Sequence, residues 1–233
     1  MLRYRLLRNH AGIMLIGDYT SLRMLHSTVH TVNEKASIID NKEGTFLGLA
    51  YDVRKAYEGA REVIKQSEDE KAVGLPDYGV QYGVEILWPV ILVQSRILRE
   101  GLSFFNSTKV HQGMTFCLEA IIEDALVDDF GYETGHLLIE YWERLHGAAQ
   151  RLLEEKLDSR GAQFCLWKKK QRMDMLVGLI ASFDPLYPLL YKQWTNRERN
   201  EQWPANHPFA AKNLVAPEAL DALKDTEWVD PKC

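Results

Sequence analysis

The chain has little cysteine, no long apolar run and no excess of positive charge. Its 233 residues include only three cysteines, Cys117, Cys165 and Cys233, which are widely spaced and form no CxxC pair. The sequence therefore predicts neither a disulfide framework nor a structural zinc site. The most apolar stretch, residues 86–98, is interrupted by proline and polar residues, so no segment approaches the ~20 apolar residues of a membrane-spanning helix.

A secretory signal and a basic surface are lacking as well. Residues 1–12 carry positive charge but no apolar stretch followed by a small-residue cleavage site, so we expect a cytoplasmic protein with no membrane partner. The 28 lysines and arginines are outnumbered by 33 acidic residues, which gives a formal charge of −5. This balance argues against a nucleic-acid partner, which requires a basic face. It is compatible with binding a basic protein, and it is also an ordinary charge for a soluble protein.

Three common catalytic motifs are absent. The sequence holds no GxSxG nucleophile elbow, no GxxxxGK[ST] phosphate-binding loop and no GxGxxG after a strand. The hydrolase, nucleotidase and dehydrogenase hypotheses therefore lose their usual support, and we expect no cofactor. A hydrophobic content of 46% excludes disorder as the overall state.

The pattern of apolar residues predicts an α+β fold, with a small antiparallel N-terminal sheet packed on a predominantly α-helical bundle. Residues 3–8 and 13–17 flank a turn-forming segment and indicate a hairpin, and the alternation in residues 45–53 indicates a third strand. Helices are expected over residues 21–35, 87–103, 108–127, 134–156, 162–181 and 185–194. We expect one domain over 1–233, made of an α+β part (1–65), a loop or linker (66–80), a helical part (81–195) and an extended C-terminal tail (196–233).

Acidic and histidine side chains in two of the expected helices have the spacing of di-iron ligands, which includes Glu-x-x-His units. At 100° per residue, however, these side chains lie away from the apolar faces of their helices, and both Glu-x-x-His units share one helix. The sequence therefore predicts that they point to solvent and that the chain holds no metal. The residues concerned are Glu119, Glu123, Glu133, His136, Glu140, Glu143 and His146.

Two further clusters have a structural interpretation. His26 and His30 lie one helical turn apart, but no HExxH motif accompanies them, so we expect boundary residues of the core rather than metal ligands. The basic cluster Trp167–Arg172 could contact an acidic partner or a phosphate. A solvent-exposed helix face is the favoured interpretation of this cluster.

The segment 51–62 is the strongest candidate for a site. Its twelve residues follow an apolar run and include two tyrosines, two arginines and three acidic residues. Tyrosine and arginine are enriched at protein-recognition hot spots. An internal ion-pair network that closes the sheet edge explains the same composition equally well. The candidate partner-binding residues are Tyr51, Asp52, Arg54, Tyr57, Arg61 and Glu62.

The stretch LGLAYDVRKAYEGARE (47–62) resembles a family of uncharacterised bacterial proteins that share a YD-hydrophobic-R-x-AY-x-G-x-RE motif. AGIMLIGDY (11–19) and EILWP (85–89) are similar to the amino-terminal hairpin and first long helix of that family, so the resemblance covers roughly residues 1–105. It implies a bacterial, intracellular α+β protein whose signature includes Tyr51, Asp52, Arg54, Tyr57 and Gly59. Lys55 departs from a histidine of the family pattern, which weakens a catalytic interpretation.

The function expected from these observations is that of a non-enzymatic cytoplasmic protein that binds another protein, such as a bacterial immunity or antitoxin-type protein or a regulatory one. One alternative is a hydrolase or nuclease that uses Asp52, Glu58 or Glu62 together with Arg54 or Arg61. The other alternative is a structural homodimer built on the long apolar helices. No catalytic residue and no metal ligand is predicted under the favoured hypothesis.

Overall fold

A four-stranded antiparallel sheet forms one layer of the molecule. The computed structural model describes residues 1–65, 79–201, 204 and 207–229. The strand order is β1-β2-β4-β3, and all neighbouring pairs are antiparallel. The strands are β1 (Arg3–Leu6), β2 (Gly12–Asp18), β3 (Glu62–Ile64) and β4 (Gln81–Leu87). The predicted N-terminal hairpin is confirmed as β1 and β2.

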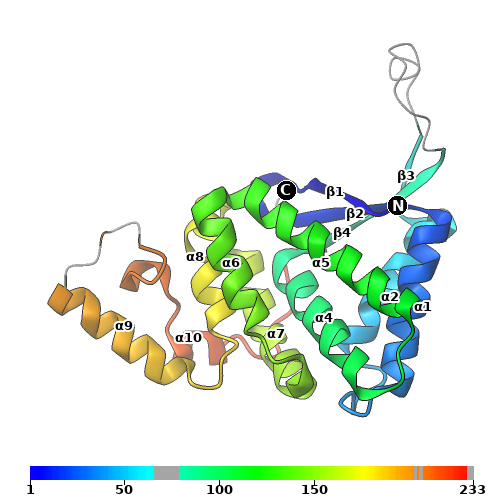
Figure 1. The fold of residues 1–233 in the computed structure, drawn as a ribbon. Helices are drawn as coiled ribbons and strands as arrows, with labels where there is room; N and C mark the ends of the chain where they lie inside the picture. Colours follow the sequence, from blue (N-terminus) through cyan, green and yellow to red (C-terminus); the bar gives the residue numbers. More distant parts are fainter. Residues whose placement is uncertain (66–78, 202–203, 205–206, 230–233) are drawn as a thin grey trace.

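The helices lie beneath one face of this sheet (Figure 1). This arrangement confirms the predicted α+β fold class. The helices are α1 (Tyr19–Lys35), α2 (Thr45–Lys55), α4 (Trp88–Gly101), α5 (Lys109–Phe130), α6 (Tyr132–Glu143), α7 (Gln150–Leu166), α8 (Lys169–Ala181), α9 (Tyr187–Glu201) and α10 (Pro217–Asp221). Within the described residues, none of them combines the length and the apolar character needed to cross a bilayer.

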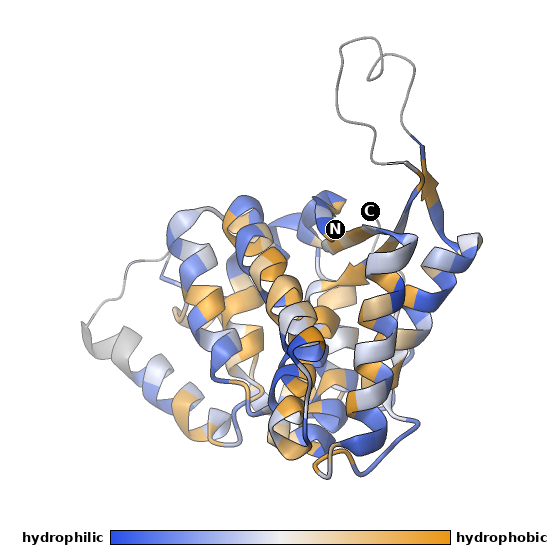
Figure 2. Cartoon of the chain, turned by 45° about the vertical axis from the view of Figure 1, so that its right-hand side comes forward, coloured by the Kyte–Doolittle hydropathy of each residue, from blue (hydrophilic) through white to orange (hydrophobic). Residues whose placement is uncertain are grey.

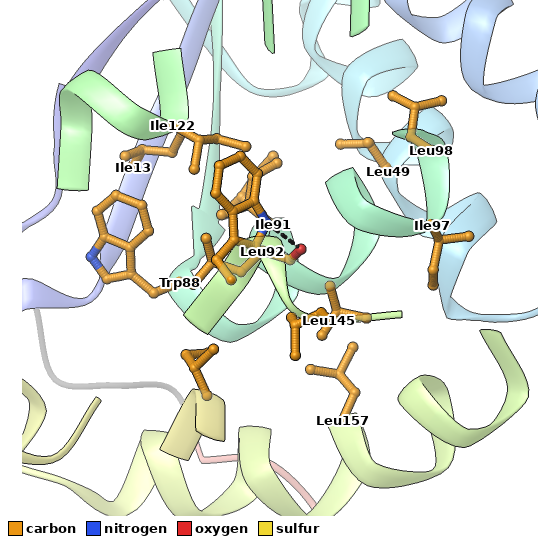
Figure 3. Close-up of a cluster of buried hydrophobic side chains, with 14 of the residues drawn as sticks. Ile13, Leu49, Trp88, Ile91, Leu92, Ile97, Leu98, Ile122, Leu145 and Leu157 are labelled. Carbon is orange, nitrogen blue, oxygen red and sulfur yellow. Dashed lines mark hydrogen bonds between the residues drawn. The ribbon is translucent and has the colours of Figure 1, made fainter. Parts of the chain in front are cut away.

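Helix α4 runs through the centre of the core. It begins with Trp88, and Pro89 occupies the first turn, where the missing N–H of proline has no intrahelical partner to lose. Its apolar side chains pack against both the sheet and the other helices (Figure 3). Figure 2 shows the same organisation, with hydrophobic residues on the inward faces of the helices. The apolar surface of α4 is therefore buried inside this chain.

The turn between β1 and β2 is fixed to the helical layer by a polar network. The Ala11 N–H donates to the Arg8 carbonyl at 3.2 Å, and the two residues between them have positive φ, 58° for Asn9 and 53° for His10. Asparagine tolerates this left-handed conformation, whereas histidine is strained in it. His10 Nδ1 lies 2.9 Å from Asp129 Oδ1, and the Trp88 indole N–H donates to Asp129 Oδ2 at 2.9 Å. These contacts to α5 and α4 hold the strained turn in place.

The prediction of a third strand over residues 45–53 is wrong, because these residues belong to helix α2. Phe46, Leu49, Ala50 and Val53 are all buried and recur at i, i+3, i+4 and i+7, which is the period of a helix face. The first turn of α2 lacks a side-chain cap of its own. Glu154 of α7 supplies one, since its Oε1 accepts a hydrogen bond from the Phe46 N–H at 2.6 Å. This stabilising contact comes from far along the chain and leaves no local signal.

The prediction of one long helix over residues 134–156 is also wrong, since α6 ends at Glu143 and α7 starts at Gln150. Arg96 of α4 donates to the Glu143 carbonyl at 3.0 Å, and Glu100 accepts from the Ala148 N–H at 2.7 Å. A Cβ atom on Gly147 would collide with the backbone of Arg96. Two side chains of α4 thus terminate one helix and support the start of the next, and glycine allows the close approach between them.

The predicted helix 162–181 is divided at Trp167 and Lys168, between α7 and α8. Trp167 is buried, whereas Lys168, Lys169 and Lys170 are exposed as predicted. Arg172 contradicts the predicted exposed face, because it is only 2% exposed. Its guanidinium donates to the Asn9 carbonyl of the β1–β2 turn at 3.3 Å and lies over the ring of Phe164. The basic cluster is therefore part surface and part core.

The C-terminal segment is less extended than predicted. Helix α9 continues to Glu201, and the short helix α10 follows at Pro217–Asp221. Phe209 stacks on Trp194 of α9 with ring centres 4.3 Å apart, and the Trp228 indole N–H donates to the Asp158 carbonyl at 2.9 Å. Aromatic side chains thus hold this segment against α7 and α9. Most of the predicted loop 66–80 lies outside the described residues.

Candidate functional site

The candidate segment 51–62 spans three elements at one margin of the molecule. It comprises the last turn of α2, a π-helical turn over Ala56–Ala60, and the start of β3. Gly59 has a φ of 78°, a left-handed conformation that ends the turn and sends the chain back toward the sheet. Figure 1 shows that β3 and α2 both lie at this margin. The six predicted residues therefore share one region, in which five divide between two surfaces and Tyr57 packs against α1.

The first surface is the outer side of α2. Tyr51 is 50% exposed, and the Arg54 guanidinium and the Lys55 ammonium each lie 5.6 Å from its ring centre. Arg54 and Lys55 also approach Glu58, at 3.8 Å and 3.9 Å. An exposed tyrosine flanked by two cations has both apolar area and hydrogen-bonding capacity available to a partner.

Tyr57 is turned away from that surface and packs on α1. Its ring makes edge contacts with Tyr19 and His26, with centres 5.4 Å and 5.7 Å apart. Burial is the main cause of the raised pKa of Tyr57. His26 and His30 are partly buried, as predicted, and burial together with the neighbouring His30 and Arg54 lowers the pKa of His26. Tyr57 therefore anchors the segment to the fold rather than offering a contact.

The second surface lies where α2 meets strands β2, β3 and β4. Arg61 contacts Asp52 at 3.1 Å, and Arg5 of β1 contacts Glu62 at 2.9 Å across the sheet. Asp52, Arg61 and Glu62 line a shallow pocket of about 360 Å³. The rest of its lining is Met14, Gly83, Val84 and Glu85. In the part of the chain that the structure describes, Asp52 and Glu62 each have an arginine partner, whereas Glu85 has no ion-pair partner.

The ion pairs of the segment lie in water. The side chains of Arg61 and Asp52 are 45% and 39% exposed, and those of Arg5 and Glu62 are 55% and 42% exposed. Pairs of this kind contribute about 0–1 kcal/mol each to stability. The predicted ion-pair network at the sheet edge is therefore present, but it is exposed rather than internal.

The predicted orientation of the helical carboxylates is partly wrong. Glu133, His136 and Glu140 are exposed, as predicted. Glu119, in contrast, is only 9% exposed and lies 3.6 Å from Arg96 and 3.5 Å from Arg99 of α4. Burial raises the pKa of Glu119, and the two arginines oppose that effect. His146 lies in the connection between α6 and α7 rather than on a helix. Among the described residues, no group of three or more potential ligands is arranged to hold a metal ion.

Four residues of the pocket, Met14, Gly83, Val84 and Glu85, were missed by the sequence prediction. Glu85 stands between Val84 and Ile86, which are buried. Alternation along a strand places a lone charged residue on the face opposite its apolar neighbours, so this signal was available. Met14 lies opposite Glu85 in the register of β2 and β4, which follows only from the strand pairing.

The family model of a domain of unknown function, DUF6904, matches residues 2–210. The chain belongs to this family. The match confirms the resemblance to an uncharacterised family that residues 47–62 indicated, and extends it well beyond the predicted limit near residue 105. No curated protein and no solved structure matches the chain.

Proposed function

We propose that this DUF6904 chain acts in the bacterial cytoplasm by binding another protein through the margin formed by α2, β3 and the adjoining sheet face. We call this margin the α2–β3 surface. Its members are Tyr51, Asp52, Arg54, Arg61, Glu62, Val63 and Glu85. A bacterial immunity, antitoxin-type or regulatory protein would act through a surface of this kind.

The observation that supports this proposal most is the exposure of the whole set of charged and aromatic side chains. Tyr51 is 50% exposed and Val63 is 43% exposed, and the ion pairs beside them are held loosely in water. Exposed apolar area surrounded by satisfied polar groups is typical of recognition surfaces. The same groups contribute little to the stability of the isolated chain.

The charge of the pocket indicates the partner side chain that it receives. Among the described residues that line the pocket, Asp52, Glu62 and Glu85 are acidic and Arg61 is basic, and Arg5 of β1 reaches Glu62 from outside the lining. The thioether of Met14 gives the pocket an apolar portion. A lysine or arginine has a matching apolar stem and a cationic head, so we infer a partner that presents a basic side chain here.

The test compares capture of a partner by matched surface variants. The purified chain is immobilised, bound proteins from the native host are identified, and a recurring partner is then purified and titrated. We expect the double variant Tyr51→Ala/Glu85→Gln to bind this partner at least tenfold more weakly, because both an apolar contact and a charge are removed. The matched control is Tyr132→Ala/Glu140→Gln, which changes an exposed tyrosine and an exposed glutamate on α6. Equal affinity of both double variants for the partner would contradict the proposal.

The alternatives make different predictions for the same pocket. A hydrolase or nuclease needs Asp52 and Glu62 for turnover, so activity on a nucleic acid or ester panel that is lost in Asp52→Asn would favour an enzyme. Arg54 and Glu58 pair on the helix side and do not line the pocket, which restricts that hypothesis to Asp52, Arg61 and Glu62. If the recurring partner is a second copy of this chain, the homodimer alternative is supported instead.

A further inference from the structure

A second, more apolar pocket lies on the opposite part of the helical layer. It has a volume of about 530 Å³ and is bounded by the end of α6, the start of α7, the turn after α8 and the first turns of α9. This volume falls within the range that accommodates small organic ligands, roughly 300–1,000 Å³. The pocket shares no residue with the α2–β3 surface.

The interior of this pocket is lined by aliphatic side chains, with aromatic rings at one end. Leu152 and Leu153 come from α7, Phe183 from the turn after α8, and Leu190 and Trp194 from α9. Behind Trp194, the ring of Phe209 stacks at 4.3 Å and also contacts Tyr141 at 5.1 Å. The aromatic end is thus held rigidly by packing from the C-terminal segment. A preformed apolar wall of this kind costs little reorganisation when a ligand binds.

The polar groups of the pocket include a cation at one side and a compensated anion at the other. Arg144 and His146 lie in the lining at the end of α6, and Asp184 lies in the turn after α8. Asp184 Oδ1 accepts a hydrogen bond from the Leu186 N–H at 2.7 Å, and the Lys156 ammonium bonds the Asp184 carbonyl at 3.1 Å. The negative charge of Asp184 therefore has a backbone donor and a nearby lysine.

Arg144 remains able to receive an anion. Its guanidinium lies over the ring of Tyr141 at 5.0 Å and pairs with Glu140, but the two side chains are 60% and 53% exposed. An exposed pair is weak and exchanges readily, whereas a ligand carboxylate can form a bidentate contact with the same guanidinium. The end of α6 thus offers the positive pole of the pocket.

We propose that this pocket binds an amphipathic carboxylate, with an aliphatic chain along Leu152, Leu190 and Trp194 and its carboxylate at Arg144. The pocket is too apolar for a sugar or a nucleotide, which would leave its aliphatic lining in contact with polar groups. A fatty acid of medium length matches both the apolar interior and the single cationic end.

The test is a titration of the chain with decanoate, measured by isothermal titration calorimetry below the concentration at which decanoate forms micelles. Leu190→Glu places a carboxylate in the pocket, and we expect it to weaken decanoate binding at least tenfold. Leu189→Glu is the matched control, because Leu189 precedes it on α9, is 64% exposed and does not line the pocket. We expect its affinity to stay within twofold of the unchanged chain. Circular dichroism of both variants shows whether α9 has kept its fold.

The position of the head group is tested by a second pair of variants and by a cationic probe. Arg144→Gln is expected to weaken decanoate binding about fivefold, because a charge-assisted hydrogen bond is lost. Arg151→Gln, which removes another exposed arginine of an i,i+4 pair outside the pocket, is expected to have no effect. Decyltrimethylammonium, which has the same chain with the opposite charge, is expected to bind at least tenfold more weakly than decanoate.

Several outcomes would overturn this proposal. They are no detectable decanoate binding by the unchanged chain, equal weakening by Leu190→Glu and Leu189→Glu, or equal affinity for the cationic and anionic probes. Loss of a protein complex in Leu190→Glu without any decanoate binding would show that the pocket is a protein-docking groove, and would also overturn the small-molecule assignment. None of these results depends on the α2–β3 surface.

Discussion

The α2–β3 surface and the helix junctions around α4, α7 and α8 use the same residue types in opposite ways. At the α2–β3 surface, Arg61 pairs with a carboxylate in water, and both side chains are about half exposed. At the helix junctions, Arg160 and Arg172 are 5% and 2% exposed and donate to backbone carbonyls. Removal of an arginine that donates to the carbonyls of a buried helix end lowers the free energy of unfolding substantially, whereas removal of an ion-paired arginine in water does not. The comparison therefore separates the groups that hold the fold from those available to a partner.

The largest expected effect is at Arg172. Replacing it with alanine removes the hydrogen bonds to the Phe164 and Asn9 carbonyls and leaves a cavity between α7, α8 and the β1–β2 turn. We expect the free energy of unfolding to fall by about 3 kcal/mol. Urea denaturation followed by circular dichroism measures this loss. Lys170→Ala, two residues earlier and exposed, serves as the control and should change stability by less than about 0.5 kcal/mol. Similar losses in both variants would remove the distinction between the two regions.

A somewhat smaller effect is expected at Arg96. Its guanidinium holds the end of α6 through the Glu143 carbonyl and pairs with the buried Glu119. Arg96→Gln should lower the free energy of unfolding by about 2 kcal/mol, because Glu119 loses a charge partner in a partly dry site. The double variant Arg96→Gln/Glu119→Gln should regain part of this loss. A double variant less stable than the single one would show that the pair is not the cause.

Glu154 tests whether α2 depends on a cap from α7. Because its carboxylate accepts the Phe46 N–H, Glu154→Ala should cost about 1–2 kcal/mol, the usual range for loss of an N-cap. Glu155→Ala is the matched control, since Glu155 is the next residue and its side chain is 52% exposed. Hydrogen exchange of the first turn of α2 should accelerate in Glu154→Ala alone. Unchanged exchange there would exclude the capping role.

The α+β class and the N-terminal hairpin could be predicted because their signals are local. The β-prone runs flank a turn, and the apolar stripes of α1 and α4 repeat with the helical period. Helix α2 was mistaken for a strand because its apolar residues also fit alternation, and its cap comes from Glu154, 108 positions away from Phe46. The break between α6 and α7 depends on Arg96 and Glu100 of another helix. Such tertiary contacts override local propensity and cannot be seen in a single sequence.

The candidate site could be located but not assembled from the sequence. Composition identified the segment 51–62, and the structure places all its residues at one margin. Which side chains share a surface depends on the π-helical turn and on strand pairing, so the separation of Tyr57 from Asp52 could not be predicted. The contact of Arg5 with Glu62 joins β1 to β3 through two residues that are 57 positions apart. Glu119 was placed in water because helix geometry alone does not show that α4 brings two arginines to it.

Lys156 is expected to make the free energy of unfolding depend on pH. Burial is the main cause that lowers the pKa of Lys156 from 10.5 to about 8. Between these pH values the unfolded chain binds more protons than the folded chain, so a rise in pH favours folding. The advantage of the unchanged chain over Lys156→Met should therefore grow by about 1 kcal/mol from pH 7 to pH 9.5, less than the full shift because the ammonium is partly solvated. Urea denaturation of both proteins at several pH values measures this difference. A constant difference would mean that the ammonium is not desolvated.

The smallest expected effect on stability is at the Asp52–Arg61 pair, and it is the most informative about function. In a double-mutant cycle with Asp52→Asn and Arg61→Gln, the coupling energy should be at most about 0.5 kcal/mol, because both side chains are largely exposed. The same substitutions change the charge around the pocket, so they should alter affinity for a basic partner while the urea midpoint stays nearly constant. A coupling above about 2 kcal/mol would place this pair with the arginines of the helix junctions. The charges of segment 51–62 would then serve the fold, and the case for a recognition surface would lose its physical basis.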